Sequence, residues 1–155
     1  MKISVIMCVM NSMPYVMASV QSFIDQKYNN KELIIVYSKS TDNTFQYLKS
    51  LNNKNIKIFK YNGKGVYSAL NFGIKKTSGE IIGILHSDDL FYDKKTIDKI
   101  AQIYKKKKSD ILFGKVFYCS KNNILNIRRT WRKIGIEKKY NLPPHTSTFI
   151  KKTIY

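Results

Sequence analysis

Two adjacent carboxylates, Asp88 and Asp89, are the residues of this sequence best suited to chemistry. They follow an apolar run, residues 81–85, which is bounded by glycine and polar residues and predicts a buried strand. Open α/β sheets bind ligands at the carboxyl ends of their strands, where this pair would lie. Neighbouring carboxylates repel each other, and a cation beside them relieves that repulsion. We therefore expect a divalent metal site that holds a phosphorylated substrate, with His86 placed to touch the ligand or the metal.

The strand before the Asp pair is one of four apolar runs, each followed by a stretch with apolar residues at helical spacing. The predicted strands are residues 3–10, 33–37, 56–59 and 81–85. Strands that alternate with helices favour a mostly parallel sheet with right-handed crossovers and helices on its faces. The sequence therefore predicts an α/β fold in which loops at one sheet edge position the Asp pair.

The alternation stops after residue 109. Three apolar runs without helices between them predict consecutive antiparallel strands at residues 110–114, 116–119 and 124–127. Residues 142–155 predict a loop and the start of a short helix. With 155 residues the chain predicts a single domain over residues 1–155.

The charge balance is strongly basic, with 28 Lys and Arg against 10 Asp and Glu and a formal net charge of +18. Such a surface attracts polyanions: nucleic acid, anionic lipid headgroups or phosphorylated small molecules. The cations are dispersed and no aromatic and basic motif of the RNA-binding sheets is present, so nucleic acid is the least favoured partner. For Trp131, between Arg129 and Arg132, the sequence leaves three roles open: covering the acceptor side of a binding site, facing anionic lipid, or packing in the core.

Two cysteines, Cys8 and Cys119, form neither a disulfide framework nor a zinc-binding pattern. Both lie in apolar runs, so we expect small core residues in a reducing compartment. No apolar run approaches the length of about 18 residues that predicts a transmembrane helix, and the first residues predict a strand rather than a signal peptide. These observations favour a cytoplasmic domain.

Four blocks of the sequence resemble, in order and spacing, the motifs of family 2 glycosyltransferases of the GT-A type. The blocks are Ile3–Asn11, Glu32–Thr44 (ELIIVYSKSTDNT), Gly65–Gly73 (GVYSALNFG) and Ser78–Leu90 (SGEIIGILHSDDL). The tail PHTSTFIKKTIY resembles a block beyond the catalytic sheet of that family. The resemblance implies a GT-A-like, Rossmann-like fold. It implies a donor-binding part over residues 1–113 and the start of an acceptor-side part over residues 114–155, C-terminally truncated relative to the family.

The resemblance also implies a nucleotide-diphosphate sugar donor, most often a UDP-sugar, and a divalent cation, Mn²⁺ or Mg²⁺. It places the nucleotide-sugar against residues of the first four blocks: Cys8, Met10, Ser38, Asn71 and Asp88. Asp89, together with Asp88, would hold the metal on the diphosphate. Carboxylate and phosphate oxygens suit such hard cations. A bound metal would neutralise the charge that develops on the departing diphosphate.

Several acids of the family's pattern are absent here. Ser38 stands where the family has the second acid of a pair that reads the nucleobase, and Gly63 and Ser68 replace two further acids. The family's catalytic base lies after the PHTSTF block, but Glu137 is the one acid after Asp110 and it precedes that block.

The catalytic base is therefore unassigned, with Glu137 and His145 as candidates. The resemblance implies inverting transfer to a lipid-linked or saccharide acceptor in bacterial-type surface polysaccharide synthesis, at the inner face of the cell membrane, with peripheral contact to anionic lipid. The alternative is a catalytically inactive or truncated relative that binds a nucleotide sugar. A basic nucleic-acid-binding protein is the third and least favoured hypothesis.

Overall fold

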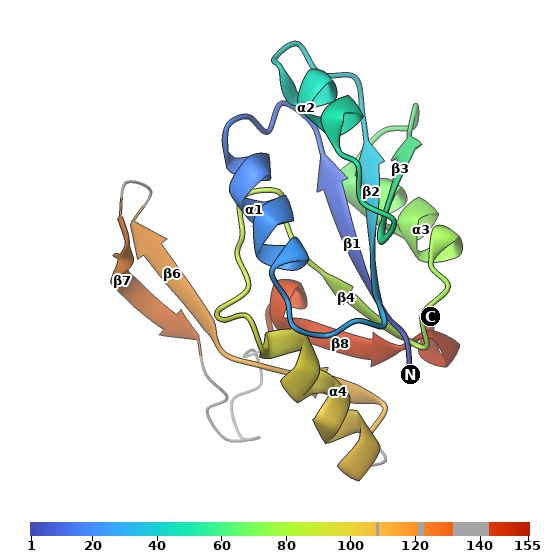
Figure 1. Cartoon of the computed structure of the whole chain (residues 1–155), viewed down its shortest axis with the longest axis vertical. Coiled ribbons are helices and arrows are strands. Elements are labelled where there is room, and N and C mark those ends of the chain that lie inside the picture. Colours follow the sequence, from blue (N-terminus) through green and yellow to red (C-terminus); the bar gives the residue numbers. More distant parts are fainter. Residues whose placement is uncertain (108, 121–122, 132–142) are drawn as a thin grey trace.

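The computed structural model describes residues 1–107, 109–120, 123–131 and 143–155. Its centre is a six-stranded sheet with the strand order β3-β2-β1-β4-β8-β5 (Figure 1). The elements in chain order are β1 Ile3–Val9, α1 Tyr15–Ile24, β2 Lys31–Tyr37, α2 Thr44–Ser50, β3 Ile56–Lys60, α3 Val66–Lys76, β4 Ile81–Ile84, α4 Thr96–Lys106, β5 Ile111–Phe113, β6 Val116–Ser120, β7 Asn123–Trp131, the 3-10 turn η1 His145–Ser147, β8 Thr148–Lys151 and the 3-10 turn η2 Lys152–Ile154.

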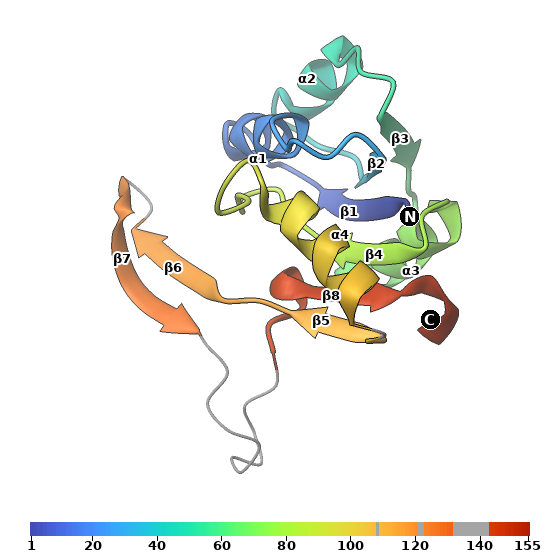
Figure 2. The ribbon, with the colours of Figure 1, turned by 60° about the horizontal axis from the view of Figure 1, so that its bottom comes forward.

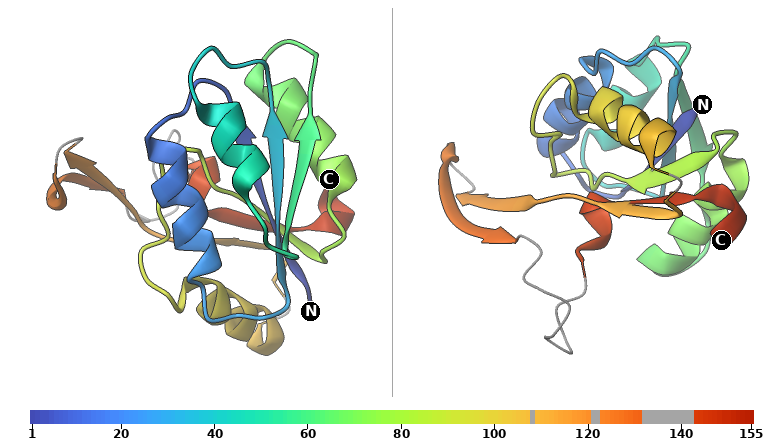
Figure 3. Two further views of the ribbon diagram at one scale, coloured as in Figure 1. Left: turned by 45° about the horizontal axis from the view of Figure 1, so that its top comes forward. Right: turned by 90° about the horizontal axis from the view of Figure 1, so that it is seen from below.

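The first four strands of the chain are parallel, as the alternating pattern predicts. Successive side chains of a strand point to opposite faces, and β1 shows this clearly. Val5 and Met7 pack with α1, α2 and α4, whereas Ile6 packs with α3. Helices α1, α2 and α4 lie on one face of the sheet and α3 lies on the other (Figure 3). Both faces of the parallel strands are therefore covered, which explains why these strands are apolar throughout.

β8 corrects the prediction of a loop and a short helix start over residues 142–155. It lies between β4 and β5 and pairs with both in antiparallel register, Ile82 and Ile111 each opposite Ile150. The hydroxyl of Tyr104 on α4 donates a hydrogen bond to the carbonyl of Phe149, 2.6 Å away. A strand of four residues is too short to show a pattern of its own, so the prediction was wrong because long-range pairing decides this segment.

The expectation of three consecutive antiparallel strands after residue 109 is half right. β6 and β7 form an antiparallel hairpin, but β5 pairs with β8 and not with β6. The hairpin makes a separate two-stranded sheet that extends away from the rest of the molecule (Figure 2). The chain leaves the main sheet at Gly114, where an added Cβ would meet nothing within 4 Å.

The two cysteines differ, contrary to the expectation that both are core residues. Cys8 is half-buried on β1, and burial raises its pKa to about 11, whereas Cys119 on the hairpin is exposed. In the part of the chain that the structure describes, no helix combines the length and the apolar character needed to span a bilayer.

Candidate functional site

The loops after β1, β2 and β4 meet at the carboxyl edge of the sheet, which is the place predicted for the site. Parallel pairing sets Val9 beside Tyr37, and the amide of Ser38 donates to the carbonyl of Val9 at 3.0 Å. Met10 and Ser38 therefore begin two adjacent loops, as expected from the sequence. Met10 is exposed and Ser38 is partly buried.

Hydrogen bonds from side chains hold the first two of these loops together. Asn11 has a φ of 47°, a left-handed conformation that Asn tolerates better than most residues. Its amide donates to Ser40 Oγ at 3.0 Å, and its Oδ1 accepts from the amide of Thr41 at 2.7 Å. Each contact joins the loop after β1 to the loop after β2, so the floor between them is preorganised.

Asp42 fixes the same junction from the other side. Its Oδ1 accepts from the amide of Thr44 in the first turn of α2, and its Oδ2 accepts from the amide of Met13, both at 3.0 Å. Hydrogen bonds from Thr44, and then from Met13, lower the pKa of Asp42. This carboxylate is engaged in structure and is not available for a ligand.

The Asp pair lies in the turn after β4. The amide of Asp89 donates to the carbonyl of His86 at 3.1 Å, and Ser87 Oγ lies 2.9 Å from Ser12 Oγ, so the turn is tied to the loop after β1. Asp88 is exposed and Asp89 is partly buried.

Among the described residues, neither carboxylate of the pair has a side-chain hydrogen bond or an ion pair. Each of the other seven described carboxylates has a hydrogen bond or an ion pair; they are Asp25, Glu32, Asp42, Glu80, Asp93, Asp98 and Asp110. This difference stands out in a chain with a net charge of +18, where a cation could be expected near every acid. The pair is therefore set apart from the structural acids of the molecule.

The electrostatics of Asp89 show the cost of this arrangement. Burial, and then the charge of Asp88, raise the pKa of Asp89, while His86 and His145 oppose the rise. A dication next to the pair would lower the pKa of Asp89 again, since an opposite charge favours the ionised form.

A pair of histidines closes the site on the side of β8. Nε2 of His86 lies 2.7 Å from Nε2 of His145, and the rings meet edge to face with centroids 4.8 Å apart. Burial, and then the neighbouring His86, lower the pKa of His145. One imidazole must accept the hydrogen bond, so at least one of the two is neutral. The contact links the Asp turn to η1 across 59 positions of sequence.

The remaining predicted site residues are placed less centrally. Cys8 lies on β1 two residues before Met10 and is half-buried, and Asn71 is exposed in the middle of α3. No contact joins Asn71 to the Asp pair within the described ranges. Glu137 falls outside the described residues. Sequence reasoning missed Ser12, Ser40 and Ser87, whose one signal is that each lies three residues after the end of a strand.

The residues at the edge suit a divalent metal held chiefly by a ligand. Among the described residues, no group of three or more His, Cys, Asp or Glu side chains could hold a metal ion. Mg²⁺ is commonly bound by one or two carboxylates together with substrate phosphates, and not by a cage made of protein alone. Two oxygen-donor carboxylates without protein partners fit that mode of binding.

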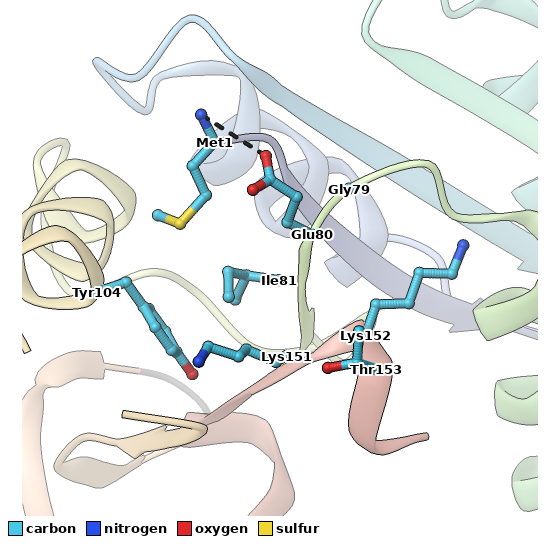
Figure 4. A pocket seen from close by; sticks show the side chains of 8 residues that line it. All are labelled: Met1, Gly79, Glu80, Ile81, Tyr104, Lys151, Lys152 and Thr153. Carbon is cyan, nitrogen blue, oxygen red and sulfur yellow. Dashed lines mark ion pairs between the residues drawn. The ribbon is translucent and has the colours of Figure 1, made fainter. Parts of the chain in front are cut away.

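A pocket of about 600 Å³ lies at the opposite, amino edge of the sheet (Figure 4). The charged groups around it already have partners. The amino group of Met1 is 3.7 Å from Glu80, Lys151 pairs with Asp110, and Lys152 donates to a backbone carbonyl. This pocket is separate from the Asp pair and does not enlarge the candidate site.

The comparisons with known proteins agree with this geometry. The model of the family described as Glycosyl transferase family 2 matches residues 4–153. An uncharacterised glycosyltransferase of Rickettsia typhi is 35% identical over 117 residues, which are 76% of this chain and 35% of that protein. The chain spans well under half the length of the curated relatives it matches, 18% of a Rickettsia bellii protein and 35% of the R. typhi one.

Solved structures match as well. A crystal structure of S. aureus TarS in complex with UDP-GlcNAc is 30% identical with a TM-score of 0.68, over 73% of this chain and 34% of that one. A second crystal structure of TarS has a TM-score of 0.74 at 22% identity, over 99% of this chain and 48% of that one, and shows the likeness of fold.

Proposed function

We propose, because this chain belongs to glycosyl transferase family 2, that it binds a uridine diphosphate sugar with a divalent metal at the carboxyl edge of its sheet and serves sugar transfer. The observation that carries the proposal is the Asp pair, two adjacent carboxylates that have no ion pair among the described residues of a strongly basic chain. UDP-GlcNAc bound to S. aureus TarS supports the choice of nucleotide.

Each part of the edge has a role in this proposal. The nucleoside lies across the ends of β1 and β2, against Cys8, Met10 and Ser38, where hydrogen bonds between the two loops keep the floor rigid. Asn71 on α3 contributes from the side of the sugar. Preorganised contacts of this kind reduce the entropy lost on binding.

Asp88 and Asp89 hold the metal and orient the diphosphate. When bound, Mn²⁺ or Mg²⁺ neutralises the charge that develops on the departing diphosphate, an effect worth several kcal/mol. The hydrogen bond between the two serines and the histidine contact keep the turn that carries the pair in place. Through the contact of its Nε2 with His86, His145 also helps to position this turn.

The acceptor step is inverting transfer to a saccharide or a lipid-linked acceptor in surface polysaccharide synthesis, at the inner face of the membrane. Glu137 and His145 stay the candidates for its base. The alternative is a protein that binds the nucleotide sugar without transferring it. A missing general base lowers the rate of transfer by about 10²–10⁴-fold.

A thermal-shift experiment tests donor and metal binding together. Uridine diphosphate sugar with Mn²⁺, at about 100 times the dissociation constant, should stabilise the chain by about 2.7 kcal/mol, or roughly 5–10 °C in melting temperature. Asp89→Ala should lose this shift. Asp98→Ala, which removes the same charge from the surface of α4, should keep it. If Asp89→Ala showed an unchanged shift, the metal role would be wrong.

Turnover separates the two forms of the proposal. Incubation with donor and Mn²⁺ and a panel of saccharide and lipid-linked acceptors should yield product or slow donor hydrolysis if the chain catalyses transfer. Donor binding with neither a transfer product nor donor hydrolysis would support the alternative, a protein that binds the nucleotide sugar without transferring it.

A further inference from the structure

The hairpin of β6 and β7 is anchored at its base and not at its tip. On one face, Trp131 is 8% exposed and its ring meets Phe113 edge to face, with centroids 6.1 Å apart. On the other face, Phe117 stacks on Tyr92, with centroids 5.2 Å apart. Tyr92 lies three residues after Asp89, so the base of the hairpin touches the loop that carries the Asp pair.

The far end of the hairpin exposes large apolar side chains. Ile124 is 62% exposed, Leu125 is 85% exposed and Ile127 is 49% exposed, and none of them belongs to either hydrophobic core cluster. Single exposed apolar residues are ordinary, but three within four positions near the end of a protruding ribbon are a concentration typical of an interaction site.

Positive charge accompanies these apolar residues. Residues 115–131 contain four cations, Lys115, Lys121, Arg128 and Arg129, and no acid. The guanidinium of Arg129 lies over the ring of Tyr118, 5.5 Å from its centroid, and both side chains are exposed. No ion pair involves Lys115, Arg128 or Arg129 within the described residues.

We propose that this hairpin docks on an anionic lipid bilayer, with Ile124 and Leu125 entering the interface and the arginines binding headgroup phosphates. Anionic membrane surfaces bind segments that combine apolar residues, which enter the interface, with cations, which contact the headgroups. Each cation near the surface raises the affinity about fivefold. Nucleic acid would use the cations but leave the apolar tip exposed. Exposed Tyr118 suits the same interface, where aromatic side chains with a polar group are enriched.

Docking of the hairpin would set the acceptor side of the site against the membrane. The stack of Phe117 on Tyr92 connects the docked segment to the loop of the Asp pair, so a lipid-linked acceptor would reach the donor without leaving the bilayer. This last step rests on the proposed function, whereas membrane binding itself does not.

Vesicle sedimentation tests the proposal on the whole chain. The chain should bind vesicles of phosphatidylcholine with about one third phosphatidylglycerol, a composition that gives a negative surface potential, and bind pure phosphatidylcholine much more weakly. R128Q/R129Q should weaken binding about 25-fold and I124S/L125S about tenfold. K105Q/K106Q, which removes the same charge from the exposed end of α4, is the matched control and should bind like the parent.

The outcomes separate this proposal from others. Equal binding by the parent and both hairpin variants, or equal weakening by K105Q/K106Q and R128Q/R129Q, would overturn it. If I124S/L125S abolished self-association in analytical ultracentrifugation without changing vesicle binding, the patch would be an interface between copies of the chain. The thermal shift with Mn²⁺ and nucleotide sugar should be unchanged in the hairpin variants, so loss of membrane binding and loss of donor binding are measured independently.

Discussion

At the amino edge of the sheet Glu32 is buried with 2% of its side chain exposed, whereas at the carboxyl edge Asp88 is exposed and Asp89 is only partly buried. Glu32 accepts hydrogen bonds from Ser4 Oγ at 2.7 Å and from the amide of Ser78 at 2.6 Å. Two lysine ammonium groups, those of residues 2 and 57, each lie 3.0 Å from its Oε2. The amino edge thus satisfies its carboxylate fully.

The pKa values follow the same division. Burial alone would raise the pKa of Glu32, but the hydrogen bonds from Ser4 and Ser78 and the two lysines hold it well below its usual range. The pKa of Asp89 is raised instead, by burial and then by its neighbouring carboxylate. The protein stabilises the charged form of Glu32 and disfavours the charged form of Asp89. If the proposed metal site is correct, this contrast separates an acid that serves structure from one that serves binding.

Glu32→Gln should produce the largest loss of stability at the amino edge. It removes the charge that compensates two lysines and weakens the five contacts of this carboxylate, and we expect the free energy of unfolding to fall by about 3 kcal/mol. This loss is at the low end of what removing one partner of a buried ion pair usually costs, because both lysines are partly exposed. Urea unfolding of the parent and the variant measures it.

The effect of Glu32→Gln should depend on pH in one direction. Because the folded pKa of Glu32 lies below its ordinary value of 4.5, its stabilisation is present above pH 4.5 and is lost as the pH falls toward the folded pKa. The two proteins should therefore converge in stability below pH 4.5. A constant difference across that range would show that the hydrogen bonds, and not the charge, carry the stabilisation.

Gly79→Ala should disturb the same edge to a smaller extent. A Cβ at this position would lie 2.5 Å from Ser4 Oγ and 2.7 Å from the amide nitrogen of Ser4, so backbone must shift. We expect a loss of about 2 kcal/mol in the free energy of unfolding. Gly114→Ala is the control, since nothing lies within 4 Å of its added Cβ, and it should change stability by less than about 0.5 kcal/mol. Equal effects would mean that the amino edge is not tightly packed around Ser4.

Asp89→Asn should have the smallest effect and the opposite sign. Removal of a charge whose pKa is raised by burial and by Asp88 relieves repulsion, so the ligand-free protein should gain about 0.5–1 kcal/mol. Differential scanning calorimetry without metal measures the gain, with Asp98→Asn as a surface control. A loss of stability would show that Asp89 has a structural partner and would remove the contrast between the two edges.

Much of the fold was predictable because local patterns specify it. The apolar runs and helical spacings predicted the four parallel strands and their helices, and the position of Asp88 and Asp89 at a strand end followed from parallel pairing. β8 was not predictable in this way, since a four-residue strand takes its identity from β4 and β5. The prediction that β5 pairs with β6 was wrong for the same reason, because β5 takes its partner from the distant β8.

The sequence by itself determined which chemistry is present: an adjacent pair of acids after a buried strand, in a chain with far more cations than anions. Tertiary structure alone decided which acids the cations reach. Glu32 precedes its predicted strand without any sign of burial, yet folding brings to it Ser78, 46 positions away, and two lysines. It also brings His145 to His86, and among the described residues it gives Asp88 and Asp89 no ion pair. Such pairings depend on distances between side chains far apart in the chain, which composition and periodicity do not encode.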